Sequence, residues 1–222
     1  MDNIKTYKGL PVFGIDMKTL ENEESGVYAV SLVGEPAIEL DMLKFSREDF
    51  KFSMNNDKQI VTSPIMLANT PILRMSPSMG YYYIVFTADV LEKLSIKYFK
   101  DGKNHSFNLN HSNELVPEAV AFESWLITSK EDKAYSMGYT EEQVPVGSWM
   151  MSIYFPDTNY WNTVVKSEEF KGLSLEGDFG IEPMYMSKDI DAELLVMLYQ
   201  SFKNNESDEL IIDKLKKLMS SK

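Results

Sequence analysis

The chain has 222 residues, of which 44% are hydrophobic and 12% aromatic, so it carries enough apolar side chains for a sizeable core. Asp and Glu outnumber Lys and Arg by 34 to 22, and the formal net charge is −12. So acidic a surface repels nucleic-acid phosphates and anionic membranes. The absence of cysteine excludes disulfides, thiolate nucleophiles and zinc–cysteine sites.

Neither a membrane nor a cofactor is expected as a partner. No run of about 18 apolar residues occurs, and residues 1–14 lack the apolar stretch of a signal peptide. No glycine-rich loop of the nucleotide-binding kind is present. The only histidines are His105 and His111, so zinc sites built on several histidines are also excluded. Any imidazole base must be one of these two.

The first half of the chain reads as strands followed by one helix. Apolar, β-branched and aromatic residues predict strands over 27–33, 60–68 and 81–86. Ser46 is expected to cap a short helix. A longer helix is predicted over 88–100, because its apolar residues recur at helical spacing. Thr87 is placed to cap its start and Gly102 to end it.

The second half continues the β-rich pattern. A hairpin is predicted with arms at 106–111 and 119–127, followed by a polar loop or flap over 129–144. Alternation over 148–155 puts Trp149, Met151, Ile153 and Phe155 on one face of a strand. A further short strand is expected at 173–175.

The C-terminal end changes to helical spacing. Ser187 is placed to cap a helix carrying Ile190, Leu194 and Leu198, and Ile211, Leu215 and Leu218 mark a final helix. We therefore predict an α+β protein: a mixed β-barrel or sandwich flanked by helices, with a C-terminal helical extension. The expected division is a main domain at 1–186 and an extension at 187–222.

His111 is the first candidate for chemistry. Alternation along its arm puts it on the face of Phe107 and Leu109, at a strand end beside a loop. It is either a partly buried histidine bonded to a backbone carbonyl, or a general base poised near neutral pH to take a proton from a hydroxyl.

Ser174 lies between Leu173 and Leu175, and alternation places it on the same face as Glu176. It is either a polar residue on an edge strand, or a nucleophile that needs a base within about 3 Å. The surrounding residues do not form the Gly-x-Ser-x-Gly turn of the α/β-hydrolases.

Two carboxylates compete for the role of orienting a catalytic histidine. Glu123 shares its strand face with Trp125 and Ile127, where a carboxylate needs a partner. It is either half of a structural ion pair or the orienting acid. Glu176 is the competitor because it shares a face with Ser174. The acids between Glu131 and Glu142 form a solvated loop or, more remotely, a Mg²⁺ or Ca²⁺ site.

Six segments in this order together resemble a family, the prohead proteases of tailed phages, and more narrowly the serine proteases assigned to prophage-like elements of Gram-positive bacteria. They are GVYAVSLVGEPAIE (26–39), YYYIVFTADVLEKL (81–94), FNLNHS (107–112), AVAFESWLI (119–127), VGSWMMSIYF (146–155) and FKGLSLEG (170–177). The resemblance covers about 9–182. It implies a fold similar to the herpesvirus assemblins, a mixed β-barrel wrapped by helices, as the domain at 1–186.

The resemblance also implies site residues. The family's histidine matches His111, and its serine, in a Gly-hydrophobic-Ser-hydrophobic strand, matches Ser174. Assemblins use a second histidine after the serine, which this chain lacks. Either an acid replaces it, with Glu123 placed slightly ahead of Glu176, or His111 and Ser174 act as a dyad.

The implied function is a serine endopeptidase that cleaves scaffold and major capsid proteins, and itself, inside the assembling prohead in the host cytoplasm. A homo-oligomer is compatible with this function. In such proteases an end segment anchors the enzyme in the scaffold core or is removed by self-cleavage. The alternative is a non-catalytic component of the procapsid core with the same fold.

Overall fold

The computed structural model describes residues 4–22, 25–34, 53–167, 170, 172–185, 201, 210–212 and 214. By internal contacts the chain divides into two compact units, one of Lys5–Met184 and one of Met1–Ile4 with Tyr185–Lys222. In the second unit, residues 210–212 and 214 are helical, as the final-helix prediction requires. The helices predicted to begin at Ser46 and Ser187 lie outside the described residues.

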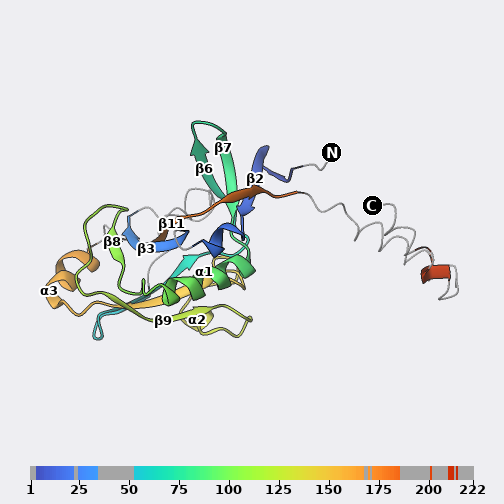
Figure 1. The fold of residues 1–222 in the computed structure, drawn as a ribbon. Helices are drawn as coiled ribbons and strands as arrows, with labels where there is room; N and C mark the ends of the chain where they lie inside the picture. The colour runs from blue at the N-terminus through green and yellow to red at the C-terminus, as the bar shows by residue number, and fades with distance from the viewer. Residues whose placement is uncertain are drawn as a thin grey trace. The chain divides into compact units, whose positions relative to one another are not determined.

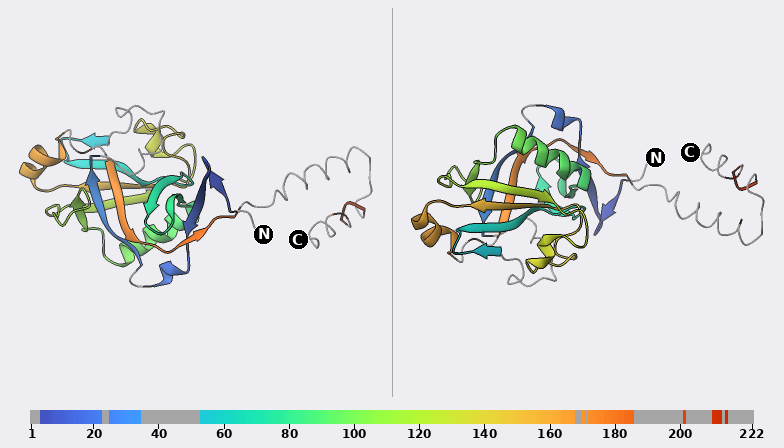
Figure 2. Two further views of the ribbon diagram at one scale, coloured as in Figure 1. Left: turned by 90° about the horizontal axis from the view of Figure 1, so that it is seen from above. Right: turned by 90° about the horizontal axis from the view of Figure 1, so that it is seen from below.

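The larger unit is built from three sheets and a few helices, which confirms the α+β class (Figures 1 and 2). The first sheet is mixed, with β2 antiparallel to β1 and β12 and parallel to β7, while β6 and β7 form a hairpin. Its strands are β1 (Thr6–Tyr7), β2 (Leu10–Ile15), β6 (Ile72–Ser76), β7 (Gly80–Val85) and β12 (Ile181–Pro183).

The second sheet is antiparallel throughout and runs in the order β4-β5-β10-β9. Its strands are β4 (Ser53–Asn55), β5 (Ile60–Met66), β9 (Val120–Leu126) and β10 (Trp149–Tyr154). The alternation predicted over 148–155 is confirmed, because Trp149, Met151, Ile153 and Phe155 all lie in the main core.

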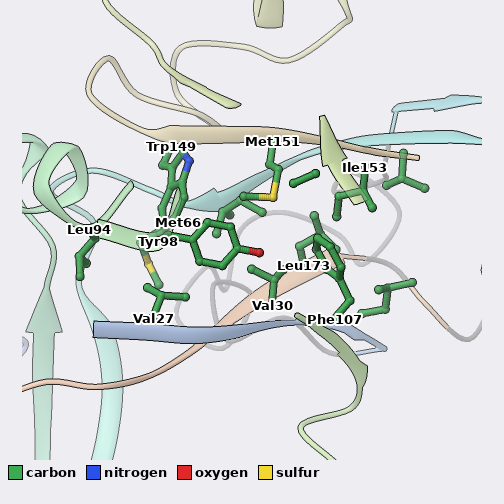
Figure 3. Close-up of a cluster of buried hydrophobic side chains, with 14 of the residues drawn as sticks. Val27, Val30, Met66, Leu94, Tyr98, Phe107, Trp149, Met151, Ile153 and Leu173 are labelled. Carbon is green, nitrogen blue, oxygen red and sulfur yellow. The ribbon is translucent and has the colours of Figure 1, made fainter. Parts of the chain in front are cut away.

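The third sheet carries the candidate site. It consists of β11 (Gly172–Asp178), β3 (Gly26–Val33) and β8 (Phe107–Leu109), in that order. Strand β11 is antiparallel to β3, and β8 is parallel to it. Its inner face supplies Val30, Phe107 and Leu173 to the core, opposite β10 of the second sheet (Figure 3).

Helix α1 (Ala88–Lys100) closes one side of this core, and it forms as predicted. The Thr87 hydroxyl accepts a hydrogen bond from the Val90 amide, which caps the first turn. Gly102 follows the helix at φ +67°, a left-handed conformation that glycine adopts without strain. The buried face consists of Val90, Leu91, Leu94 and Tyr98.

The polar segment at 129–144 covers the outer face of the second sheet and contains the short helix α2 (Lys133–Ser136). A second apolar cluster forms beneath it, from Leu67, Ile127, Ala134, Tyr139, Val144 and Met150. The other helical turns are η1 (Thr19–Glu21), α3 (Thr158–Tyr160) and η3 (Trp161–Val165), the last wound as a π-helix. Among the described residues, no helix is long and apolar enough to cross a bilayer.

Two expectations differ from the structure. The predicted hairpin between 106–111 and 119–127 is wrong, because β8 pairs with β3 whereas β9 pairs with β10 in another sheet. The chain instead folds back locally, through an antiparallel bridge between Asn108 and Leu115. The other expectation is the β-barrel: β11 lies beside β5, but no strand of one sheet pairs with a strand of another, so the described strands do not form a closed barrel.

Candidate functional site

Three polar side chains form a row across the third sheet. Ser31 of β3 is the register partner of Ser174 on β11 and of Asn108 on β8. Paired residues on neighbouring strands project to the same face, so these three lie together on the face opposite the core. All are buried, with exposed fractions of 0% for Ser31 and 6% for both Ser174 and Asn108.

His111 joins this row because the backbone leaves the strand before it. Asn110 and His111 have φ of +46° and +55°, and the Ser112 amide donates to the Leu109 carbonyl at 2.9 Å. Two consecutive left-handed residues between the acceptor and the donor of such a hydrogen bond form a type I′ turn. The turn is fastened to β3, since the Asn110 amide donates to the Leu32 carbonyl at 2.9 Å.

This turn corrects the face predicted for His111. Strict alternation would place its ring with Phe107 and Leu109, but β8 ends at Leu109 and the left-handed turn redirects the chain. The ring therefore reaches the polar side chains instead. Its Nδ1 atom lies 3.2 Å from Glu176 Oε1 and 3.1 Å from Ser31 Oγ.

Glu176 is the hub of the cluster. Its Oε1 atom accepts hydrogen bonds from the Ser31 hydroxyl and, at 2.6 Å, from Nδ2 of Asn108. Burial by itself would raise the pKa of Glu176, but the hydrogen bonds from Ser31 and Asn108, together with the neighbouring His111, outweigh burial and hold this pKa below its usual range. Glu176 is therefore ionised at neutral pH.

The pair of His111 and Glu176 opens onto a cleft of about 520 Å³ between the first and third sheets. The His111 side chain is 43% exposed. The half-buried Arg74 on β6 supplies the cleft with a positive charge. The remaining lining is largely aromatic and aliphatic: Ile15, Tyr28, Met66, Tyr82, Ile84, Phe86, Leu175, Phe179 and Ile181, with Gly177 and Asp178. A cleft that combines apolar side chains with convergent charged groups has features of a ligand site.

Ser174 lies close to this pair without being bonded to it. It precedes Glu176 by two residues on β11 and is paired in register with Ser31, which contacts the His111 ring. Among the described residues, however, the Ser174 hydroxyl makes no hydrogen bond. The structure thus places Ser174, His111 and Glu176 in one region and joins only the last two.

Glu123 is placed elsewhere. It lies on β9 of the second sheet, where it forms an ion pair with Lys133 and accepts a hydrogen bond from the Ser152 hydroxyl at 2.9 Å. The Lys133 hydrogen bond is the main reason that the pKa of Glu123 is lowered, against the opposing effect of burial. Glu123 makes no contact with His111 in the described part of the chain.

The acidic stretch between Glu131 and Glu142 does not converge on one point. Glu141 pairs with Lys130 at 2.9 Å, and Asp132 accepts hydrogen bonds from the Trp125 indole and the Ala134 amide. Among the described residues, no three His, Asp or Glu side chains are grouped as metal ligands.

Ser31 and Asn108 were missed as candidate residues in the sequence. A signal was present, because each interrupts an apolar strand with one polar residue: Ser31 between Val30 and Leu32, and Asn108 between Phe107 and Leu109.

Comparison of the chain with protein-family models, with curated proteins and with solved structures finds no match in any of the three.

Proposed function

We propose that the protein is a serine endopeptidase in which Ser174 is the nucleophile, His111 the general base and Glu176 the acid that orients the base. The observation that carries the proposal is the contact between His111 Nδ1 and ionised Glu176 at the wall of a cleft, with Ser174 two residues away from Glu176 on the same strand. Between Glu123 and Glu176, we choose Glu176 because only it contacts the histidine.

The proposed chemistry follows the division of labour in serine hydrolases. Glu176 accepts a hydrogen bond from the Nδ1–H group of His111 and stays ionised, which leaves Nε2 as the basic nitrogen. Ser174 Oγ bonds to the scissile carbonyl carbon while its proton passes to Nε2. When the C–N bond breaks, that proton goes to the leaving amine. Water then attacks the acyl-enzyme, its proton goes to Nε2, and the Ser174 oxygen regains a proton as the acid product leaves.

Ser31 is a poorer candidate nucleophile, although it is the serine that touches the histidine. Its side chain is fully buried, and it contacts Nδ1, the nitrogen that also faces Glu176. A nucleophile must instead lie on the Nε2 side, where the proton is taken. Nε2 and Ser174 need a shift of the His111 turn to meet, and substrate binding can supply such a shift.

The biological setting of the proposal comes from the family resemblance. We propose an assemblin-like protease domain that acts inside an assembling phage head, with scaffold and major capsid proteins as substrates. A site in which serine and histidine are not yet joined suits an enzyme that must stay silent until the shell is complete. The alternative, a non-catalytic component of the procapsid core, predicts that Ser174 has no special reactivity.

The decisive experiment is to express the full chain together with phage scaffold and major capsid proteins as candidate substrates. The Ser174→Ala variant should abolish their cleavage, as seen by mass spectrometry of the products. Ser152→Ala is the matched control, because Ser152 is also a buried strand serine, 2% exposed, but lies in the second sheet. Cleavage at an unchanged rate in Ser174→Ala would refute the assignment.

Labelling with a fluorophosphonate separates the enzyme from the structural alternative. An enzyme should form one covalent adduct on Ser174 in the assembled particle, and Ser174→Ala should lose it. If no adduct forms while the particle is otherwise processed normally, the protein is a structural component.

A further inference from the structure

We propose that Ser31 and Asn108 are positioning residues: together they hold the Glu176 carboxylate against Nδ1 of His111 and so fix which ring nitrogen carries the proton. The catalytic meaning of this clamp rests on the proposed function, but its effect on the imidazole does not. Both residues are buried and make their side-chain hydrogen bonds within this cluster.

The geometry of the sheet sets the clamp. Ser31 and Asn108 are register partners on parallel strands, and their side chains meet at 2.5 Å between Oγ and Oδ1. Glu176 reaches them from β11, on the other side of β3. Backbone ladders thus fix all three carbon frames, and the carboxylate can change position only by breaking hydrogen bonds to two separate strands.

Counting protons defines the state of the ring. The Asn108 amide nitrogen donates to Glu176 Oε1, and the single proton of Ser31 can go to Glu176, to Asn108 Oδ1 or to His111 Nδ1. Ionised Glu176 has no proton to give. An unprotonated Nδ1 would turn its lone pair toward the negative Glu176 oxygen 3.2 Å away, whereas Nδ1–H can donate to that oxygen. The contact therefore favours the neutral ring with its proton on Nδ1 and its lone pair on Nε2.

The burial of Ser31 and Asn108 indicates that they have a specific role, because buried polar side chains are unfavourable in an apolar strand. A hydroxyl and an amide in the middle of apolar strands cost free energy unless their hydrogen bonds are satisfied. Here one carboxylate oxygen satisfies both, and the same two donors help keep Glu176 ionised despite its burial. Removing either donor should loosen the carboxylate and release the constraint on Nδ1.

The test is the tautomer of His111, read from long-range ¹H–¹⁵N spectra of the full chain at a pH about two units above the ordinary histidine value of about 6.5. The chain has only two histidines, so His105 is an internal reference. We expect the Nδ1–H form for His111. Ser31→Ala and Asn108→Ala should each convert a large share of it to the Nε2–H form, and Ser31→Thr, which keeps the hydroxyl, should restore Nδ1–H.

Ser152→Ala is the matched control, since it also removes a buried serine hydroxyl that donates to a glutamate, here Glu123. It should leave the His111 signals unchanged. The proposal is overturned if His111 is in the Nε2–H form in the unaltered chain, or if both alanine variants fold and keep Nδ1–H. Backbone amide spectra establish folding, and either alanine variant alone suffices if the other does not fold.

Kinetics distinguish the failure of this inference from the failure of the proposed function. With a cleavable substrate, Ser31→Ala should lower kcat about tenfold with little change in KM, whereas Ser174→Ala abolishes turnover. Abolished turnover in Ser31→Ala with activity retained in Ser174→Ala would make Ser31 the nucleophile and overturn the inference. If no variant changes cleavage but the tautomer shifts as described, the clamp stands and the protease assignment fails.

Discussion

At the scale of single residues, the variants Glu176→Gln and Glu123→Gln test which of the two carboxylates orients His111. Glu176→Gln should keep the side chain's shape but offer Nδ1 an amide in place of a carboxylate. Loss of the orienting acid costs serine hydrolases on the order of 10⁴-fold in kcat, and we expect a loss of about 10³–10⁴-fold here. Peptide cleavage by the purified variant measures it.

Glu123→Gln is the counterpart of that variant. The ion pair of Glu123 with Lys133 is exposed, with side-chain exposures of 39% and 43%, so its loss should cost less than about 1 kcal/mol of unfolding free energy. Activity should be unchanged. A large loss of activity in Glu123→Gln, with little effect in Glu176→Gln, would reverse the assignment of the acid.

The lowered pKa of Glu176 predicts how stability depends on pH. Because hydrogen bonds from Ser31 and Asn108 hold the folded-state pKa below the unfolded value of about 4.3, Glu176 stabilises the fold above that pH, and this contribution is lost as pH falls through the folded value. Ser31→Ala removes one donor, so the pKa of Glu176 should rise and the contribution should shrink.

Urea unfolding at a series of pH values measures this effect. The difference in unfolding free energy between the unaltered chain and Ser31→Ala should be greatest near neutral pH and should narrow below about pH 4. A difference that stays constant across the series would mean that Ser31 does not act through the ionisation of Glu176.

At the scale of elements, Gly147 shows how the flap joins the sheet. It has φ +93°, and a Cβ there would lie 2.7 Å from the Ala88 Cβ and 3.1 Å from the Ala68 Cβ. Gly138 has a similar φ of +102°, but a Cβ there meets nothing within 4 Å. Gly147→Ala and Gly138→Ala therefore share backbone strain of about 1–3 kcal/mol, and only Gly147→Ala adds overpacking.

The added cost should be about 1–3 kcal/mol, measured by urea unfolding of both variants side by side. If the two variants lose the same stability, α1 and the end of β5 are free to move apart, and the close approach at Gly147 does not constrain the fold.

Elements with local signals could be predicted from the sequence, whereas their partners could not. Helix α1 follows from apolar spacing, the Thr87 cap and Gly102, all within a few turns of one another. The pairing of Ser31 with Ser174 joins residues far apart in the chain, and nothing local encodes it. The prediction for the face of His111 was wrong for a local reason. Alternation applies only within a strand, and the left-handed conformation of Asn110 ends strand β8.

At the scale of the whole molecule, the larger unit should fold without the C-terminal segment. All the described strands lie between Thr6 and Pro183, as do Ser31, Asn108, His111 and Glu176. A chain ending at Tyr185 should unfold cooperatively, with a Tm within about 2–4 °C of the full chain, the change that about 1 kcal/mol makes at this size. Thermal scans by near-UV circular dichroism check this.

A shortened chain that keeps its far-UV signal but loses its near-UV signal would contradict the prediction, because it would have lost fixed side-chain packing. It would also show that the boundary near residue 186 does not separate an independent domain from an extension.

The placement of Ser174 and Glu176 on one strand has a mechanical consequence. Because they lie two residues apart on β11, a shift of that strand moves both backbone positions together and leaves the distance between them nearly unchanged. His111 belongs to a different segment, a tight reversal tied to β3. The distance from His111 to both residues therefore depends mainly on the position of the turn at Asn110 and His111. A partner or substrate that holds or displaces this turn would switch the whole site on or off.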